Sequence, residues 1–338
     1  MDYIIEQLKR LTSIDSPSGF TGEVTDYTLN ELKQLGFEPK KTNKGCVVCC
    51  LGGEGRPLIL SAHIDTLGGM VAEIKANGRP RITNIGGLNA NNCETENCRI
   101  RTRSGKTYSG TLQMNDPSVH VNGEYSEQKR TFDNMEIVVD EPVSCKADTE
   151  ALGIAVGDFV CFDPRTTIIE SGYIKSRFLD DKLSVAVLLG LAQDIHVGRV
   201  VPKRKIYVFI TVYEEVGHGA CGGLPGDAEE VISVDMGCVG IGLMCTERMV
   251  SICAKDSLGP YDYGVTNALI ACAKEAGLDY AVDIYPHYQS DADASMTAGY
   301  DLKHGLIGAG VYASHGYERS HVDGVRNTHE LLKLYVSR

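Results

Sequence analysis

Five segments of this 338-residue chain share one form, an apolar run that ends in ionisable side chains. In chain order they are LILSAHIDTLGG, FLDDKLS, VFITVYEEVG, VISVDMG and GVYASHGYE. Apolar runs of this length are typical of buried strands, and open α/β sheets bind their ligands beyond the carboxyl ends of the strands. We therefore expect these segments to bring their polar side chains together at one site.

Strand-like and helix-like segments alternate along most of the chain. The pattern predicts two helices within residues 1–36 and further helices over 182–195, 262–277 and 326–336, the last capped by Asn327 or Thr328. It predicts strands over 45–53, 57–65, 205–215 and 230–237. This alternation indicates an α/β core with a mostly parallel sheet.

Residues 70–164 differ in composition and pattern from the rest of the chain. They are rich in Asn, Gly and Thr, with short alternating segments and no helical period. Such a stretch favours a small unit of β-barrel type. We therefore expect one α/β domain made of residues 1–69 and 165–338, with a β-barrel domain of residues 70–164 inserted into it.

Composition excludes several classes of partner. The net charge of −12 argues against nucleic acid, whose binding depends on clustered Lys and Arg. No apolar stretch is long enough to span a membrane, and the first residues form an amphipathic pattern rather than a secretory signal. The twelve cysteines include one C-x-x-C pair, Cys46 and Cys49, but no second pair at zinc-finger spacing, so we expect reduced thiols and a cytoplasmic location.

The polar side chains that end the five segments are histidines and carboxylates, which are the ligand types for zinc, cobalt and manganese. They are His63, Asp65, Asp180, Asp181, Glu214, Glu215, Asp235 and His315, and His321 competes with the last of these. So many carboxylates in one place would need a cation to stay ionised. The set therefore predicts a divalent metal site, and two metals sharing a carboxylate can activate a water molecule.

Several motifs resemble those of the dinuclear-metal aminopeptidases of metallopeptidase family 42. They are SPSGFTGEV, AHIDTLGG, VGDFVCFDP, FLDDKLS, TVYEEVG, SVDMG and SLGPYDYG, which together span nearly the whole chain. The resemblance implies an α/β fold with a zinc-peptidase (phosphorylase/hydrolase-like) α-β-α core and an inserted β-barrel domain. The chain departs from the family pattern at Lys182, Tyr213 and His218, and in the spacing between Tyr312 and His315.

The resemblance also implies a role for each matching residue. His63 would be a metal ligand oriented by Asp65, Asp180 the bridging carboxylate with a cis bond to Asp181, Glu214 the general base, Glu215 a further ligand, and Asp235 a ligand of the other metal with His315 as its partner. His321 stays the alternative for the last ligand.

From this resemblance we expect a metal-dependent aminopeptidase that binds two divalent ions per subunit, zinc first, with cobalt or manganese as alternatives. The substrate would be a short peptide, and the family forms homo-oligomers that are often dodecamers. The alternative function is a metal-dependent deacylase acting on a small non-peptide amide. An inactive metal-binding scaffold and a glycosidase are weaker alternatives. Asp291 and Asp293 could bind a substrate amine or a basic side chain, or could serve as turn and helix-cap residues.

Overall fold

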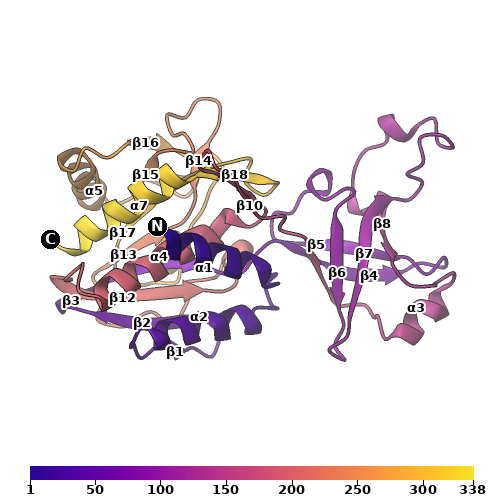
Figure 1. Ribbon diagram of the computed structural model, residues 1–338, viewed down its shortest axis with the longest axis horizontal. Coiled ribbons are helices and arrows are strands. Elements are labelled where there is room, and N and C mark those ends of the chain that lie inside the picture. Colours follow the sequence, from indigo (N-terminus) through magenta and orange to yellow (C-terminus); the bar gives the residue numbers. More distant parts are fainter. The chain divides into compact units, whose positions relative to one another are not determined.

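The computed structural model describes residues 1–338 and divides into two compact units (Figure 1). The first comprises Met1–Asp65 and Arg165–Arg338, and the second comprises Thr66–Pro164. None of the helices is both long and apolar enough to cross a membrane. All twelve cysteines are free.

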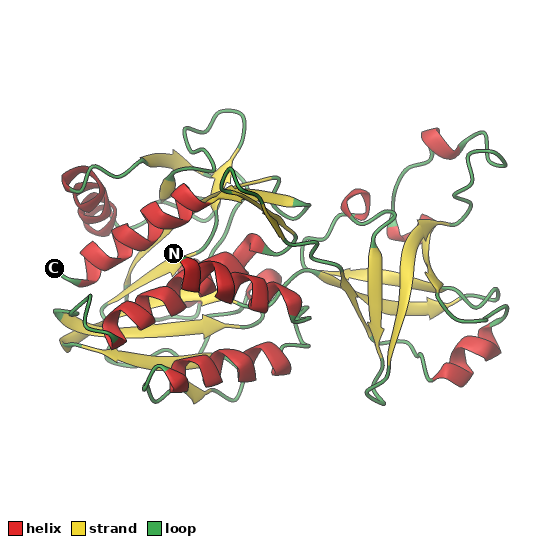
Figure 2. Cartoon of the chain, viewed as in Figure 1, coloured by secondary structure: helices red, strands yellow, loops and turns green.

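The first unit is built on one twelve-stranded sheet (Figure 2). Its strands are β1 (Lys40–Lys41), β2 (Val47–Gly52), β3 (Glu54–His63), β10 (Thr167–Ile168), β11 (Tyr173–Ser176), β12 (Arg204–Thr211), β13 (Glu230–Val234), β14 (Gly237–Val239), β15 (Val250–Lys255), β16 (Tyr280–Ile284), β17 (Lys303–Tyr312) and β18 (Glu318–His321). The main order is β1-β2-β12-β3-β13-β17-β18-β11-β10.

The sheet is parallel at its centre and antiparallel toward its edges. Strands β12, β3, β13 and β17 run parallel, whereas β2 pairs antiparallel with β12, and both β15 and β18 pair antiparallel with β17. The sheet is therefore mixed, with the expected parallel arrangement in the part that carries the polar strand ends. Strands β2 and β3 run in opposite directions, because β2 is antiparallel and β3 parallel to β12. The single residue Gly53 between them is consistent with this, since a parallel crossover needs a dozen residues or more.

Helices cover both faces of this sheet. They are α1 (Asp2–Ser13), α2 (Gly22–Gln34), α4 (Leu179–His196), α5 (Tyr263–Glu275), α6 (Asp291–Thr297) and α7 (Val322–Val336). Helix α4 lies on β3 and contacts both α1 and α7. Helix α6 lies on the opposite face, because the backbone N–H of Ala292 donates to Ser233 Oγ, and Ser233 sits beside Ser61 on that face.

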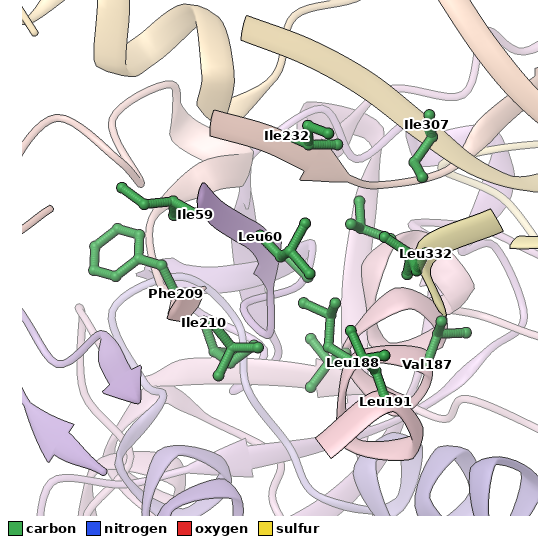
Figure 3. Packing of buried hydrophobic residues seen from close by; sticks show 14 of the residues in the cluster. Ile59, Leu60, Val187, Leu188, Leu191, Phe209, Ile210, Ile232, Ile307 and Leu332 are labelled. Atoms are coloured by element: carbon green, nitrogen blue, oxygen red, sulfur yellow. The ribbon is translucent and has the colours of Figure 1, made fainter. Parts of the chain in front are cut away.

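The core covers both faces of the sheet, and one part of it lies between α4 and the sheet (Figure 3). Leu60 and Ile210 point toward Leu188 and Leu191 of α4, whereas Ile59 extends to the other face, as expected from the two-residue period of a strand (Figure 3). Residues 183–192 of α4 are all buried, because α1 and α7 cover the sides of the helix that the sheet does not. The predicted helix over 182–195 is confirmed.

The second unit is a six-stranded antiparallel sheet. Its strands are β4 (Gly68–Ile74), β5 (Pro80–Ile85), β6 (Asn97–Arg101), β7 (Thr107–Met114), β8 (Met135–Val139) and β9 (Phe159–Phe162), in the order β5-β4-β9-β6-β7-β8, with the short 3-10 helices η1 (Ala90–Asn92), η2 (Tyr125–Glu127) and η3 (Phe132–Asn134) between them. The end strands β5 and β8 contact each other, so the sheet curls into a nearly closed barrel. Helix α3 (Lys146–Leu152) was not predicted, since its seven residues are too few to show a helical period.

Two predicted boundaries in the first unit are wrong by four residues, the largest differences there, and both lie near the polar strand ends. The strand predicted over 205–215 stops at Thr211, because Tyr213 takes a left-handed conformation with φ of 71°. The last helix begins at Val322, about one turn before the predicted start, because His321 caps it by accepting the backbone N–H of Asp323 on Nδ1.

Candidate metal centre

The carboxyl ends of the central strands bring together one group of three candidate ligands. His63 ends β3, Asp235 follows β13, and Asp180 lies at the start of α4. Single ligand atoms of these three side chains all lie within 4.8 Å of one another, and His63 Nε2 is 3.1 Å from Asp180 Oδ1. All three are buried. Because β13 pairs in parallel with β3, the carboxyl ends of these two strands are adjacent.

A second group of three shares Asp180 with the first. His315, in the loop after β17, places Nε2 3.5 Å from Asp180 Oδ2 and 3.6 Å from Glu215 Oε2. The resemblance implied that His315 would pair with Asp235, but His315 lies with Glu215, and Asp235 lies with His63. The two groups therefore meet at Asp180, whose two oxygens face different histidines.

The Asp180–Asp181 peptide bond is cis, as the resemblance implied. Both residues have non-helical backbone angles, so the regular part of α4 begins at Lys182. The Asp181 carboxylate does not belong to either group of three. Its Oδ2 accepts the backbone N–H of His63, which ties the start of α4 to the end of β3.

Glu214 and Glu215 lie on a single 3-10 turn, η4 (Glu214–Val216), rather than on the strand. Residues with positive φ flank the turn on both sides, Tyr213 at 71° and Gly217 at 84°. The backbone N–H of His218 donates to the carbonyl of Tyr213, and the two rings stack with centroids 5.1 Å apart. The turn lets two neighbouring carboxylates face one site, which adjacent positions on a strand would not allow.

Asp65 connects this turn to the end of β3. Its Oδ1 accepts the backbone N–H of Glu214 at 3.1 Å, and its Oδ2 accepts that of Glu215 at 3.3 Å and the hydroxyl of Ser18. The ring of His63 contacts the backbone carbonyl of Asp65, 3.0 Å from Nδ1, more closely than the carboxylate at 3.7 Å. The carboxylate of Asp65 thus holds the glutamate turn, while its carbonyl orients the histidine.

Glu318 connects backbone segments of the second group, as Asp65 connects the glutamate turn to β3. Its role was not predicted from the sequence. It is buried, its Oε2 accepts the backbone N–H of Asp180 at 3.1 Å, and its Oε1 accepts that of His315 at 3.0 Å. The only sequence signal was its place at the end of GVYASHGYE. Glu318 holds in register two of the three members of the second group.

His321 does not join either group. Its Nδ1 accepts the N–H of Asp323 as a helix cap, and its Nε2 lies 2.9 Å from the carbonyl oxygen of Ser171. Both ring nitrogens are therefore occupied by structural contacts. Of the two histidines left open by the sequence, only His315 lies beside Asp180 and Glu215.

The electrostatics of the cluster are those of crowded, desolvated carboxylates. Burial, together with the charge of Asp180, raises the pKa of Asp235 to about 7. Burial and neighbouring carboxylates also raise the pKa of Glu214 and of Glu215 well above the usual value. Asp180 differs, because hydrogen bonds with His315 and His63 outweigh its burial and lower its pKa.

The donor set fits a pair of divalent cations. Three carboxylates and two imidazoles form the two groups, and one of these carboxylates, Asp180, belongs to both. The Oε1 atom of Glu215 is buried without a hydrogen-bond partner, although buried polar atoms are rarely left unpaired. A cation between these groups would supply the missing partner and relieve the repulsion that raises the carboxyl pKa values.

A cavity of about 640 Å³ opens onto the cluster. Its lining includes Asp180, Glu214, Glu215, Asp235 and His315 of the cluster. Much of the rest is formed by Ser257, Leu258, residues 287–291, Asp293, Ala294 and Thr297. The cavity is large enough for an amino acid side chain and its neighbouring amide.

Asp291 and Asp293 are part of the cavity wall and hold α6 in place. The backbone N–H of Ala220 donates to Asp291 Oδ1 at 2.7 Å, and the hydroxyl of Thr211 donates to Oδ2. Asp293 forms a capping box with Ser290, so the helix-cap alternative is confirmed for that residue.

The chain is similar to known aminopeptidases in sequence. The family model for the M42 glutamyl aminopeptidases matches residues 45–331. The Bacillus subtilis protein named "Putative aminopeptidase YhfE" is 47% identical over 334 residues, covering 98% of this chain and 96% of its own. A lysyl aminopeptidase of Pyrococcus furiosus and a glutamyl aminopeptidase of Lactococcus lactis are 25% and 28% identical, each covering 63% of this chain and 60% of their own.

Solved structures share the fold. An aminopeptidase of the archaeon Desulfurococcus kamchatkensis superposes with a TM-score of 0.87 at 23% identity, covering 99% of this chain and 94% of its own. The TET1 peptidase of Pyrococcus horikoshii, described as assembling into a tetrahedron or a large octahedral shell, gives 0.85 at 20% identity over 98% and 99%.

The fold and the cluster together define a hydrolase of the metal-dependent aminopeptidase class. The family model covers most of the chain, and a close relative covers nearly all of it. The chain belongs to the M42 aminopeptidase family.

Proposed function

We propose that this protein removes N-terminal residues from short peptides and that it does so with two divalent metal ions. The observation that carries the proposal is the pair of three-residue groups that share Asp180, with Glu214 beside them at the cavity. His63 and Asp235 would hold one ion, Glu215 and His315 the other, and Asp180 both. Zinc is the first candidate, with cobalt and manganese as alternatives that the same ligands accept.

When bound, the metal pair supplies an activated water nucleophile and polarises the scissile carbonyl. Glu214 is the residue of this chain that moves the proton. It lines the cavity, and its Oε2 lies 3.7 Å from His63 Nε2, so its carboxylate faces the site without belonging to either group of ligands. Glu214 takes the proton of the attacking water, holds it on its carboxyl group and gives it to the leaving amine.

Asp65 acts through its neighbours. Its carboxylate fixes the turn that carries Glu214 and Glu215, and its carbonyl fixes the ring of His63. We assign it a positioning role and keep Glu214 as the general base. We also assign the chemistry to the unit of residues 1–65 and 165–338, because every candidate side chain lies there.

The experiment that tests the proposal combines metal content with a substrate panel. The purified full chain should bind two equivalents of zinc, lose hydrolysis of aminoacyl anilides and dipeptides on chelation, and regain it when metal is restored. Acylated amino acids in the same panel test the deacylase alternative, since their scissile amide has no free α-amine beside it. Cleavage of acylated amino acids alone would refute the aminopeptidase.

Two expectations from the sequence stay proposals. Assembly into a homo-oligomer is supported by the large assemblies described for the TET1 peptidase, and light scattering of the purified chain tests it. A cytoplasmic location is supported by the free state of all twelve cysteines, which suits a reducing compartment.

A further inference from the structure

The cavity beside the metal centre has an uneven distribution of charge. No Lys or Arg is among the residues that line it. Apart from His287 and the candidate ligand His315, its charged side chains are carboxylates. Two of them, Asp291 and Asp293, belong neither to the ligand groups nor to the turn that carries Glu214. Two divalent cations would balance the four carboxylates of the cluster, but they would leave these two aspartates uncompensated.

The donors that hold the two aspartates are neutral. Asp291 accepts from a backbone N–H and a threonine hydroxyl. Asp293 accepts the N–H and the hydroxyl of Ser290 at 3.0 and 2.9 Å and the hydroxyl of Tyr261 at 3.0 Å. Burial raises the pKa of Asp291, and burial together with the neighbouring carboxyl group of Asp256 raises that of Asp293 to about 7. Neither aspartate has a cation as partner, so the charge on this wall of the cavity is negative and favours positive over negative side chains.

Two lysines occur near the segments that form the wall, and both point to backbone carbonyls. Lys44 donates to the carbonyls of His218 and Gly219. Lys255 donates to the carbonyl of Asp256 at 2.6 Å. Neither lysine lines the cavity, so neither is placed to receive a carboxylate from a substrate.

We propose that this cavity receives the N-terminal side chain of the peptide, accepts neutral and cationic side chains, and discriminates against Glu and Asp. The inference rests on the proposed aminopeptidase function and adds a substrate class to it. This preference differs from the glutamyl specificity in the description of the family. The physical reason is that the cavity has no Lys or Arg to replace the water around an incoming carboxylate.

Matched substrates isolate the charge. With the zinc-loaded full chain at pH 7.5, glutaminyl anilide should be cleaved with a kcat/KM at least about tenfold above that of glutamyl anilide, which has nearly the same shape. Lysyl anilide should be cleaved at least as well as the norleucyl compound. Equal or faster cleavage of the glutamyl substrate would overturn the proposal.

A charge-supplying variant provides the second test. Thr297 lies at the end of α6, is exposed and lines the cavity, so a longer side chain can be placed there without disturbing the core. Thr297→Lys should raise the glutamyl to glutaminyl ratio of kcat/KM by about tenfold, whereas the matched Thr297→Met should leave the ratio unchanged. An unchanged ratio in a folded Thr297→Lys that still cleaves the glutaminyl substrate would count against the inference.

The same measurements separate this inference from the function beneath it. If the chain cleaves aminoacyl anilides with the opposite charge preference, the aminopeptidase assignment stands and the substrate class is wrong. If it cleaves none of them with metal bound, the aminopeptidase assignment fails and the substrate class fails with it.

Discussion

Glu318 Oε2 accepts the backbone N–H of Asp180 at 3.1 Å, and the two residues lie at the start of different elements, β18 and α4. The second oxygen of the same carboxylate accepts the N–H of His315. One buried side chain thus fixes the backbones of two residues to which we assign a shared metal. Outer-shell contacts of this kind orient ligands and raise affinity for the ion.

We therefore predict that Glu318→Ala weakens zinc binding by about 10- to 100-fold, because both N–H groups lose their acceptor. Glu318→Gln keeps one carbonyl oxygen and should lie between Glu318→Ala and the wild type. Zinc affinity measured by competition with a chelator checks this. Glu230→Gln is the matched control, since Glu230 is a buried carboxylate held by Arg204 and Tyr335 and lies outside both ligand groups. Wild-type zinc affinity in Glu318→Ala would contradict the prediction.

Glu214→Gln should remove the proton acceptor while leaving the ligands in place. We expect kcat to fall by about 10²- to 10⁴-fold with metal content unchanged. Steady-state kinetics and metal analysis on the same preparation check both halves of this statement. A variant that keeps near-wild-type turnover would show that another group accepts the proton.

The two late histidines should respond differently to substitution. His315→Ala should reduce the zinc content from two equivalents toward one, because it removes a ligand of the group that also contains Glu215. His321→Ala should keep two equivalents and lower the melting temperature instead, since it removes a helix cap, typically worth about 1 kcal/mol. Elemental analysis and calorimetry distinguish the two effects, and loss of zinc in His321→Ala would reverse the assignment.

The stability of the metal-free protein should depend on pH in an unusual direction. Burial raises the pKa of Asp235 from 3.8 to about 7 in the folded chain, so between these values the folded state binds more protons than the unfolded state. Stability contributed by this group is present at low pH and is lost as pH rises toward 7. The melting temperature of the chelated protein should therefore fall over this range.

Metal should reverse this trend, since its carboxylate and histidine ligands must be deprotonated to bind. We expect the difference in melting temperature between zinc-loaded and zinc-free protein to grow from pH 5 to pH 7. Calorimetry of both forms at matched pH checks it. A difference that is constant or shrinks over that range would show that these carboxylates do not take up the metal.

The sequence predicted the part of the site that follows from local patterns. Apolar runs before His63, Glu215 and Asp235 indicated strand ends, although β12 stops at Thr211 and Glu215 follows on a turn. Parallel pairing of the central strands brings such ends to one edge. The cis bond at Asp180 followed from the resemblance alone. Local patterns could not show which candidate ligands share a group, because that grouping depends on the order of strands in the sheet.

The features missed from the sequence depend on contacts between distant parts of the chain or on local conformations without a pattern. Ser18 lies in a family motif and Glu318 ends one of the five polar segments, but neither position indicates the role, because their partners lie far away in sequence. The turn at Glu214 arises from the left-handed conformation of Tyr213, which a tyrosine rarely adopts. His321 caps a helix although histidine is not among the residues that usually mark such a position.

The candidate ligands come from five separate segments, and the last of them follows β17, close to the C-terminal end of the chain. A ribosome-bound chain that has produced β3, α4 and β13 already carries His63, Asp180 and Asp235, but β17, which lies next to β13 in the sheet, has not yet been made. In the proposed arrangement, the complete pair of ions can be taken up only after synthesis of the chain is nearly finished. Metal loading would then report that the strand ends from β3 to β17 have come together.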